Sequence, residues 1–229
     1  MAVSIKSARE IELMREAGKR LAHVHQELEA MIAPGISTWE IDAKGEKLIR
    51  DCGCIPNFLH YNGYPASICV SVNDEVVHGI PRKDRYLKEG DIVSLDAGLI
   101  YKGYHSDAAR THAVGKVSTE AQKLMDVTKQ SFFEGIKMAK EGQHLHDISR
   151  AIEEYVTPYG YGIVRDLVGH GIGTALHEDP QIPNYAQKRR GVRLQAGMTL
   201  AIEPMINAGT WQVRFLRDGW TVVTKDGSL

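Results

Sequence analysis

The sequence predicts an α+β fold in which two related halves form a single domain over residues 1–229. Three observations support this class. Two helical segments are followed by strand-like segments, and this order occurs twice along the chain. Residues at helix ends and strand starts recur at a fixed offset of 107 positions. The segment LDAGLIYKGYHSDAAR at 95–110 has the pattern of a β-hairpin with a tight turn.

The composition is typical of a soluble globular protein, with 43% hydrophobic residues, 25% charged residues and a formal net charge of −1. This balance disfavours a nucleic-acid or membrane-surface partner. No apolar run approaches the roughly 18 residues of a membrane span, and the N-terminus lacks the apolar region of a secretory signal. Cys52, Cys54 and Cys69 do not have the common C-x-x-C spacing. We therefore expect three reduced thiols in a cytosolic protein.

Helices in the first half are marked by their N-termini. S-x-x-E capping boxes occur at residues 7–10 and 37–40, each followed by apolar residues at helical spacing. The first helix is expected to end at 34–35, a Pro-Gly pair, and the second near residue 52. Two further helices are expected at 119–140 and 145–157, since each has an apolar face and a glycine beyond its end.

Strands fill the rest of each half. Asn62-Gly63 in FLHYNGYP is a strong short signal for a hairpin turn. Runs rich in β-branched and apolar residues, bounded by turn residues, predict buried strands. These strands are expected at 67–72, 91–100 and 195–209.

The offset of 107 positions relates the two halves. It places DIVSLD on MTLAIE, so that Asp96 corresponds to Glu203. The other matched pairs are Met31/Met138, Gly35/Gly142, Ile41/Ile148, Gly53/Gly160, Leu87/Leu194 and Gly90/Gly197. Chance is an alternative, because a few identities between two helix–strand units are easy to find. We expect an internal repeat at roughly 8–107 and 117–229, the second copy incomplete.

The hairpin at 95–110 brings two carboxylates together. If residues 102–103 form a two-residue turn, Asp96 lies opposite Ala109 and Asp107 lies opposite Gly98. The two aspartates then share a face as diagonal neighbours, with backbones about 7–8 Å apart. A four-residue loop keeps this register, whereas a three-residue loop does not.

Two like charges on one face of an apolar hairpin are costly to bury. Three alternatives avoid this cost: the carboxylates point to solvent, they share a proton, or they bind cations. A third carboxylate, Glu203, approaches the pair if the halves pack face to face, and His170 lies between glycines that permit close backbone approach. Carboxylates with one imidazole suit Mn, Fe, Co or Zn. Several shared carboxylates suit two such ions that activate a water molecule.

Motifs along the whole chain now identify a family. The segments HYNGYP, NDEVVHGIP, GDIVSLDAG, YHSDAART, GHGIGTALHEDPQIPNY and GMTLAIEPM resemble those of the type I methionine aminopeptidases. The resemblance implies the pita-bread fold, with two pseudo-symmetric halves around a curved antiparallel sheet and helices outside. It implies removal of the initiator methionine when the second residue is small, by metal-activated water attack on the first peptide bond.

The resemblance also assigns roles to individual residues. It implies two divalent ions (Co, Mn, Fe or Zn), with Asp107 bridging them, and four ligands: Asp96, Asp107, His170 and Glu203. Catalytic roles fall on His78, His177 and Glu203. The two histidines contact the substrate and assist proton transfers. The methionine side-chain pocket is lined by Phe58, Tyr61, Tyr64, Cys69 and Trp220, whose apolar, aromatic character suits a thioether.

Alternative functions are weighed against this reading. A prolidase or aminopeptidase P relative shares the fold, but the aromatic HYNGYP segment and the absence of an extra N-terminal domain argue against it. A non-catalytic pita-bread binding protein would have lost ligands, whereas four are present. The implied partners are nascent polypeptide N-termini and the ribosome. We expect a cytoplasmic monomer that reads no nucleic acid directly and binds no membrane.

The chain departs from the family after Leu229. The family has a fifth ligand, a bridging glutamate in a final strand, and this sequence stops before that strand. Either the chain is a fragment of a longer protein or it is a truncated, impaired form. We expect the chain as written to bind at most one metal tightly and to have little peptidase activity.

Overall fold

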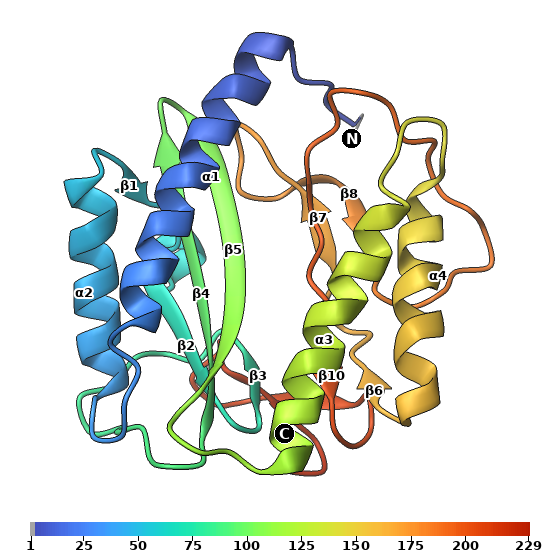
Figure 1. The fold of residues 1–229 in the computed structure, drawn as a ribbon. Coiled ribbons are helices and arrows are strands. Elements are labelled where there is room, and N and C mark those ends of the chain that lie inside the picture. The colour runs from blue at the N-terminus through green and yellow to red at the C-terminus, as the bar shows by residue number, and fades with distance from the viewer. Residues whose placement is uncertain (1–2) are drawn as a thin grey trace.

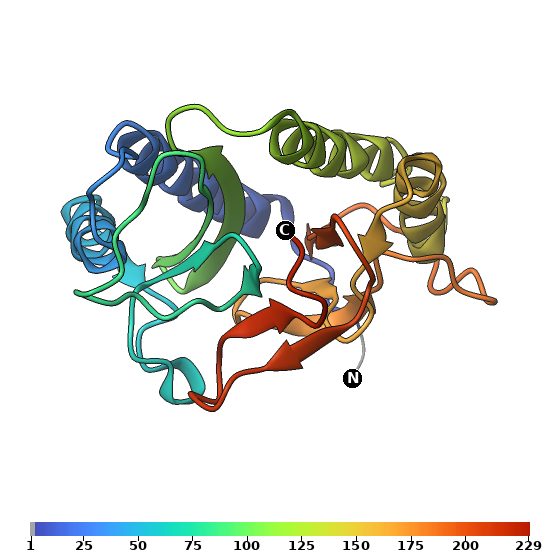
Figure 2. The same ribbon diagram turned by 90° about the horizontal axis from the view of Figure 1, so that it is seen from below.

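Helices lie outside the strands in both halves of the molecule. The computed structural model describes residues 3–229. Helices α1 (Ala8–Glu29) and α2 (Thr38–Asp51) flank the first half, and α3 (Thr119–Lys137) and α4 (Leu145–Val156) flank the second (Figure 1). Seen from below, the four helices follow one rim and the strands the other (Figure 2). No helix within residues 3–229 is long and apolar enough to cross a membrane.

The strands pair only in the antiparallel sense within the described residues. They form four hydrogen-bonded groups, in the orders β1-β4-β2 with β5 on β4, β10-β6, β11-β12-β3 and β8-β7-β9. The first-half strands are β1 (Ile55–Pro56), β2 (Ile68–Val72), β3 (Glu75–Val77), β4 (Ile92–Tyr101) and β5 (Tyr104–Ala113). The others are β6 (Gly162–Ile163), β7 (Gly169–Gly171), β8 (Glu178–Ile182), β9 (Leu200–Ala201), β10 (Ile206–Asn207), β11 (Val213–Phe215) and β12 (Val222–Thr224). The structure also contains two short 3₁₀ turns within the described residues, η1 (Tyr61–Gly63) and η2 (Thr157–Tyr159).

Both predicted capping boxes are confirmed. Ser7 and Ser37 each accept a hydrogen bond from the backbone three residues on, and the glutamate at that position bonds back. Helix α1 ends earlier than predicted, at Glu29, because i→i+3 bonds tighten the chain there, as from Met31 N–H to Leu28 O at 3.2 Å. Helix α3 likewise ends at Lys137, short of the predicted residue 140.

The same local connections occur in both halves at the offset of 107 positions. The Gly35 N–H donates to Leu87 O at 2.8 Å, and the Gly142 N–H donates to Leu194 O at 3.0 Å. Both glycines have positive φ, 92° and 87°, a conformation that side chains disfavour. Isolated bridges repeat as well, joining Ser37 to Tyr86 and His144 to Arg193. The halves are therefore pseudo-symmetric where helices meet strands.

Two predicted elements are wrong. Asn62-Gly63 has positive φ at both residues, but it closes a local loop in which His60 N–H donates to Tyr64 O at 2.8 Å, so no strands pair across it. The expected strand at 195–209 is two short strands, β9 and β10, which pair with β7 and β6. Pro204 lies between them and has no N–H to donate, which prevents one continuous ladder.

Each half has its own apolar core. In the first half, α1 and α2 cover the outer face of β2 and β4, burying Leu21, Ile49, Ile68 and Leu95. In the second half, α3, α4 and the strands share a core that contains buried residues such as Ile148 and Ile152. The helices thus take one face of the strands, and the opposite face is left for polar side chains.

Candidate metal centre and substrate pocket

The β4–β5 hairpin has the predicted register. Lys102 and Gly103 form the turn, with φ of 49° and 84°, as a type I′ turn requires. Asp96 pairs with Ala109, and Gly98 pairs with Asp107. The two aspartates therefore lie diagonal to each other on the face turned away from α1.

Glycines around His170 allow three backbone segments to meet. A Cβ on Gly169 would lie 2.3 Å from Ala201 O, and a Cβ on Gly171 would lie 2.2 Å from Asp179 O. Either contact is impossible for a real side chain, so both positions require glycine. His170, which is 6% exposed, is in this way held between β8 and β9.

Three residues converge on one point. His170 Nε2 lies 3.0 Å from Glu203 Oε1 and 3.6 Å from Asp107 Oδ2. One ligand atom from each of these three residues lies within 4.8 Å of the other two. His170 Nδ1 lies 2.8 Å from Gly171 O, so its N–H donates there and Nε2 faces the carboxylates. Asp96 is outside this closest group and joins it through Asp107.

The electrostatics of this cluster favour a bound cation. Burial raises the pKa of the Asp96 carboxyl well above its usual range, and the charges of Asp107 and Glu203 raise it further. Burial also raises the pKa of Glu203. Burial alone would lower the pKa of His170, but the neighbouring carboxylates raise it to about 10. Clustered carboxylates of this kind are stabilised when positive charge is placed among them.

The donor set fits a divalent metal. Oδ1 of Asp96 is buried with no hydrogen-bond partner among the described residues, which is the condition expected of a ligand atom. Carboxylate oxygens with one imidazole nitrogen suit Mn, Fe, Co or Zn. The outward N–H of His170 is fixed by a carbonyl, as metal-ligating imidazoles usually are.

Glu203 is held by a residue that the sequence reasoning missed. The Asn184 side chain is fully buried and donates from Nδ2 to Glu203 O at 2.7 Å. Asn184 follows β8 in the motif QIPNY, directly after Pro183, and nothing else in the sequence distinguishes it. The contact orients the backbone that presents the Glu203 carboxylate.

The predicted pocket residues form one cluster beside the metal centre. Phe58, Tyr64 and Cys69 are buried in it, and Tyr61 and Trp220 pack against it. These residues come from the loop before β2, from β2 itself and from the segment before β12. The cluster also contains five residues that the sequence reasoning missed: Met14, Ala66, Ile80, Ile172 and Leu176.

Contacts within the cluster connect it to the metal centre. Cys69 pairs with Asp96 across β2 and β4, and burial raises the pKa of its thiol. The Tyr64 hydroxyl donates to Gly79 O at 3.0 Å, and its ring meets the edge of Trp220 at a centroid distance of 5.1 Å. The apolar pocket and the carboxylates are therefore on adjoining parts of one surface.

Both predicted pocket histidines face this region. The His177 ring lies 4.2 Å from the His170 ring, and its Nδ1 lies 2.8 Å from the Tyr61 hydroxyl. Burial and the neighbouring His170 lower the pKa of His177. The His78 ring lies 6.4 Å from Trp220, and burial lowers the pKa of this imidazole as well.

His78 is held in an unusual backbone conformation. Its φ is 57°, which a residue with a side chain rarely adopts. Gly79 follows it so close to β2 that a Cβ there would lie 2.3 Å from Val70 O, and its N–H donates to the Ser71 hydroxyl at 3.0 Å. Such local strain is typical of residues placed for function.

One histidine lies elsewhere than its sequence pattern predicts. The pair His23-Val-His25 predicts surface positions for both histidines, because residues i and i+2 do not share a helix face. The structure buries His25 completely, and its Nε2 donates to Ala108 O at 2.8 Å. The signal was present, since His25 follows Leu21 by four positions and precedes Leu28 by three, which places it in the buried stripe of α1.

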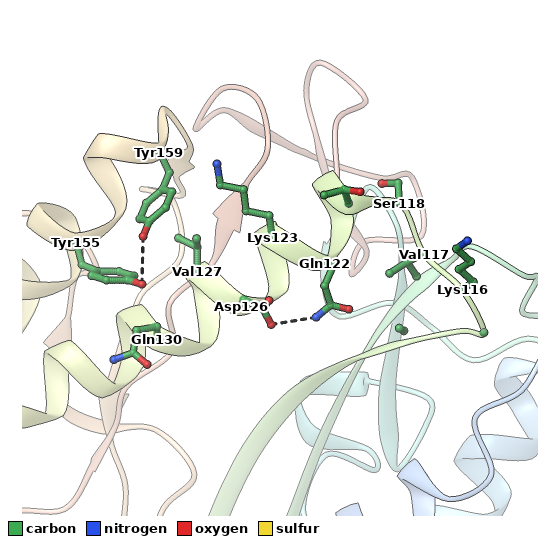
Figure 3. A pocket seen from close by; sticks show the side chains of 13 residues that line it. Lys116, Val117, Ser118, Gln122, Lys123, Asp126, Val127, Gln130, Tyr155 and Tyr159 are labelled. Atoms are coloured by element: carbon green, nitrogen blue, oxygen red, sulfur yellow. Dashed lines mark hydrogen bonds between the residues drawn. The ribbon is translucent and has the colours of Figure 1, made fainter.

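A separate hollow of about 1060 Å³ lies along α3 (Figure 3). The segment 113–119, the exposed side of α3, Tyr155 and Tyr159 line it. The two tyrosine hydroxyls point toward each other at 3.4 Å, and Lys123 lies over the Tyr159 ring. None of the predicted site residues lines this hollow.

Comparison with known proteins agrees with this geometry. The family model of metallopeptidase family M24 matches residues 12–225. A methionine aminopeptidase of Clostridium acetobutylicum is 53% identical over 227 residues, covering 99% of this chain and 91% of the relative. Methionine aminopeptidase 1 of Bacillus subtilis is 52% identical over 222 residues, covering 97% of this chain and 89% of the relative.

Solved structures show the same likeness. The crystal structure of methionine aminopeptidase from Thermotoga maritima matches with a TM-score of 0.97 and 46% identity, covering 99% of this chain and 91% of that one. The prolidase from Pyrococcus furiosus matches with a TM-score of 0.75 and 23% identity, covering 96% of this chain and 60% of that one. The second match shows a shared fold alone.

Proposed function

The chain belongs to metallopeptidase family M24, and we propose that Asp96, Asp107, His170 and Glu203 hold the divalent metal with which it removes the initiator methionine from nascent polypeptides. It is a metalloaminopeptidase of the pita-bread fold. The observation that carries the proposal is the convergence of ligand atoms from Asp107, His170 and Glu203 within 4.8 Å, beside an apolar aromatic pocket.

The metal site would hold two divalent ions on the carboxylates of Asp96, Asp107 and Glu203 and the imidazole of His170, although the sequence alone predicts only one tightly bound ion for the chain as written. Support comes from the number of carboxylate oxygens on one face and from the buried, unpartnered Oδ1 of Asp96. Co, Mn, Fe and Zn all suit this donor set, and geometry and cellular availability, rather than raw affinity, select among them. When bound, the ions supply Lewis acidity toward water and toward the scissile carbonyl.

The protein's own residues would orient the substrate and move protons. We assign Glu203 to proton transfer as well as metal binding, because its carboxylate adjoins His170 at the mouth of the site. The neutral imidazole of His177 accepts from the Tyr61 hydroxyl at Nδ1, which leaves the Nε2–H free to donate to the substrate. His78, fixed by its backbone, would donate from its place beside Trp220.

The apolar cluster would bind the methionine side chain. Phe58, Tyr61, Tyr64, Cys69 and Trp220 offer aromatic and polarizable surface, which favours contact with a thioether sulfur. Since the cluster adjoins Asp96 through Cys69, a methionine seated there would place the first peptide bond next to the carboxylates. We expect selectivity for a small second residue, as in the family.

The other functions weighed from the sequence are less well supported. A non-catalytic binding protein is not favoured, because relatives named methionine aminopeptidase align over nearly the whole chain at about half identity. A prolidase activity is not favoured, because the prolidase of Pyrococcus furiosus is 23% identical to this chain, against 46% for the methionine aminopeptidase of Thermotoga maritima. Removal of methionine is therefore the function retained.

Four finer expectations complete the proposal. The internal repeat would span roughly residues 8–107 and 117–229, supported by the hydrogen bonds that recur at the same offset. The protein would act as a monomer, and in the cytoplasm, where its three free cysteines stay reduced. It would work near the ribosome, because its substrates are nascent polypeptide N-termini.

A peptide-release assay tests the proposal. The sequence alone predicts little activity for the chain as written, but relatives named methionine aminopeptidase align over nearly all of it. The chain, loaded with Mn²⁺ or Co²⁺, is therefore expected to release methionine from Met-Ala-Ser, to release far less from Met-Leu-Ser and to leave an Xaa-Pro dipeptide intact. A chelator should abolish release, and added metal should restore it. Cleavage of the Xaa-Pro dipeptide in preference to Met-Ala-Ser would overturn the proposed function.

A further inference from the structure

The segment before α1 is tied to the second half of the molecule. The Lys6 N–H donates to Gly197 O at 2.8 Å. Gly197 has a φ of 93°, and a Cβ there would lie 2.7 Å from both Ile5 Cγ2 and Lys6 O. The chain near residue 6 is therefore packed closely on the loop that leads into β9, although α1 itself covers the first half.

Lys6 forms a buried ion pair with Glu178. Its Nζ lies 2.6 Å from Glu178 Oε2, and the two side chains are only 5% and 14% exposed. Oε2 also accepts from the Ser4 hydroxyl at 3.2 Å, and Oε1 accepts from the Ala175 N–H at 3.2 Å. Burial raises the Glu178 pKa, but these bonds outweigh burial and hold it below its usual value.

The ion pair packs directly against Gly173. A Cβ on Gly173 would lie 2.5 Å from Lys6 Cε and 2.6 Å from Glu178 Oε1. Another backbone bond, from the His105 N–H to Gly173 O at 2.8 Å, fixes the same turn to β5. The turn between β7 and β8 is therefore clamped between the N-terminal segment and the hairpin that carries Asp107.

This turn carries the residues that face the substrate. His170 lies in β7 at its start, and His177 directly precedes Glu178 at its end. The His177 ring must keep both its 4.2 Å distance to His170 and its 2.8 Å contact with the Tyr61 hydroxyl. A shift of the Glu178 backbone would move the neighbouring imidazole by a similar amount.

We propose that Lys6 and Glu178 are positioning residues, whose ion pair fixes the β7–β8 turn and so aims His177 at the substrate. This inference rests on the proposed function of His177. Neither residue touches the reacting atoms. Their effect on turnover would arise from placement, to which catalysis is sensitive at the scale of about 1 Å.

Two measurements test the pair. In Lys6→Met, the metal-free chain is expected to show faster amide hydrogen exchange across residues 171–178, because an uncompensated buried carboxylate is left in the turn. The Mn²⁺-loaded variant is expected to lose about tenfold in kcat for Met-Ala-Ser, with KM changed less than about twofold. Lys6→Arg should retain most of the activity, because it keeps the charge.

A matched control is available on α1. Lys19 and Glu16 are also 2.6 Å apart, but their side chains are 64% and 38% exposed. Lys19→Met should leave both exchange at 171–178 and kcat unchanged. The double variant Lys6→Met with Glu178→Gln should be less impaired than Lys6→Met alone, since no buried charge is then unpaired.

The outcomes separate this inference from the proposed function. Unchanged exchange at 171–178 in Lys6→Met, or an equal loss of kcat in Lys19→Met, would overturn the positioning role. A variant that only melts at lower temperature, with normal kcat in the folded range, would also overturn it. Absence of any methionine release from the parent chain would contradict the proposed function, while the exchange comparison would still test the clamp.

Discussion

His170 Nε2 lies 3.0 Å from Glu203 Oε1, although His170 belongs to β7 and Glu203 lies in the segment between β9 and β10. The contact depends on β7, whose flanking glycines let the backbone at Ala201 approach closely. It also depends on Asn184, which fixes the backbone carbonyl of Glu203. The second half of the molecule thus delivers one imidazole and one carboxylate to the aspartates of the hairpin.

Glu203→Gln should weaken metal binding. The substitution keeps the side-chain shape but removes the negative charge and one anionic ligand. We expect Mn²⁺ affinity to fall by at least the roughly 10- to 100-fold that loss of an outer-shell partner costs. Isothermal titration with Mn²⁺ measures this directly. Asp126→Asn, an exposed carboxylate on α3, is the control, and equal affinities of the two variants would contradict the ligand role.

The hairpin turn can be tested by two opposite substitutions. Gly103 has a φ of 84°, so Gly103→Val should destabilise the protein by about 1–2 kcal/mol. Lys102 has a φ of 49°, so Lys102→Gly should be neutral or stabilising by less than about 1 kcal/mol. Chemical denaturation of the metal-free chain gives both values. Destabilisation by Lys102→Gly as large as by Gly103→Val would be inconsistent with a type I′ turn.

The hairpin was predictable because its determinants are local. A two-residue turn and a period of two decide which residues pair, so Asp96 and Asp107 could be placed on one face before any tertiary contact was known. The capping boxes at Ser7 and Ser37 are local as well. Helix ends were less accurate, because 3₁₀ tightening, rather than the next proline or glycine, terminates α1.

The parts of the fold and of the site that were not predicted depend on packing between segments that are distant in sequence. Met14 of α1 and Ile172 after β7 enter the pocket cluster only because the two halves meet there, and neither residue has a distinctive neighbour in sequence. The ion pair of Lys6 and Glu178 joins residues 172 positions apart in sequence, so it too depends on the packing of distant segments. The prediction of one strand at 195–209 was wrong because a proline separates β9, which pairs with β7, from β10, which pairs with β6.

Trp220 is expected to contribute binding rather than chemistry. It packs against Tyr64 and His78 at the edge of the pocket cluster, so Trp220→Ala removes apolar surface from the proposed methionine site. We expect KM for Met-Ala-Ser to rise about 10- to 100-fold, from a loss of roughly 1.5–3 kcal/mol of burial. Steady-state kinetics measure the change. Trp39→Ala, at an exposed residue of α2, should leave KM unaltered, and a comparable rise there would exclude a specific pocket role.

His78→Ala should reduce turnover without loss of metal. The imidazole is outside the closest ligand group, and burial keeps its pKa below the usual value, which suits the proposed role of a neutral donor to the substrate. Removing one such donor should lower kcat about 10²- to 10³-fold. Metal content, measured by elemental analysis, should equal that of the parent chain. An unchanged kcat would remove His78 from the catalytic residues, and His23→Ala serves as the control.

His25 should make the stability of the metal-free protein depend on pH. Burial lowers the pKa of its imidazole from 6.5 to about 4, with smaller contributions from Arg110 and His112 that outweigh the attraction of Asp107. Because the folded pKa is lowered, the unfolded chain binds the proton more tightly between these values. The stabilisation is therefore complete above pH 6.5 and is lost as the pH falls toward 4, by up to about 3 kcal/mol.

The variant His25→Gln should remove that dependence. Glutamine still offers an N–H to Ala108 O, and it does not titrate. The free energy of unfolding, measured with denaturant at pH 7.5 and 4.5, should differ less between the two pH values in His25→Gln than in the parent chain. His23→Gln on the same helix should keep the full dependence. Equal slopes for the parent chain and His25→Gln would show that other groups, such as the carboxylates of the metal centre, dominate the response to acid.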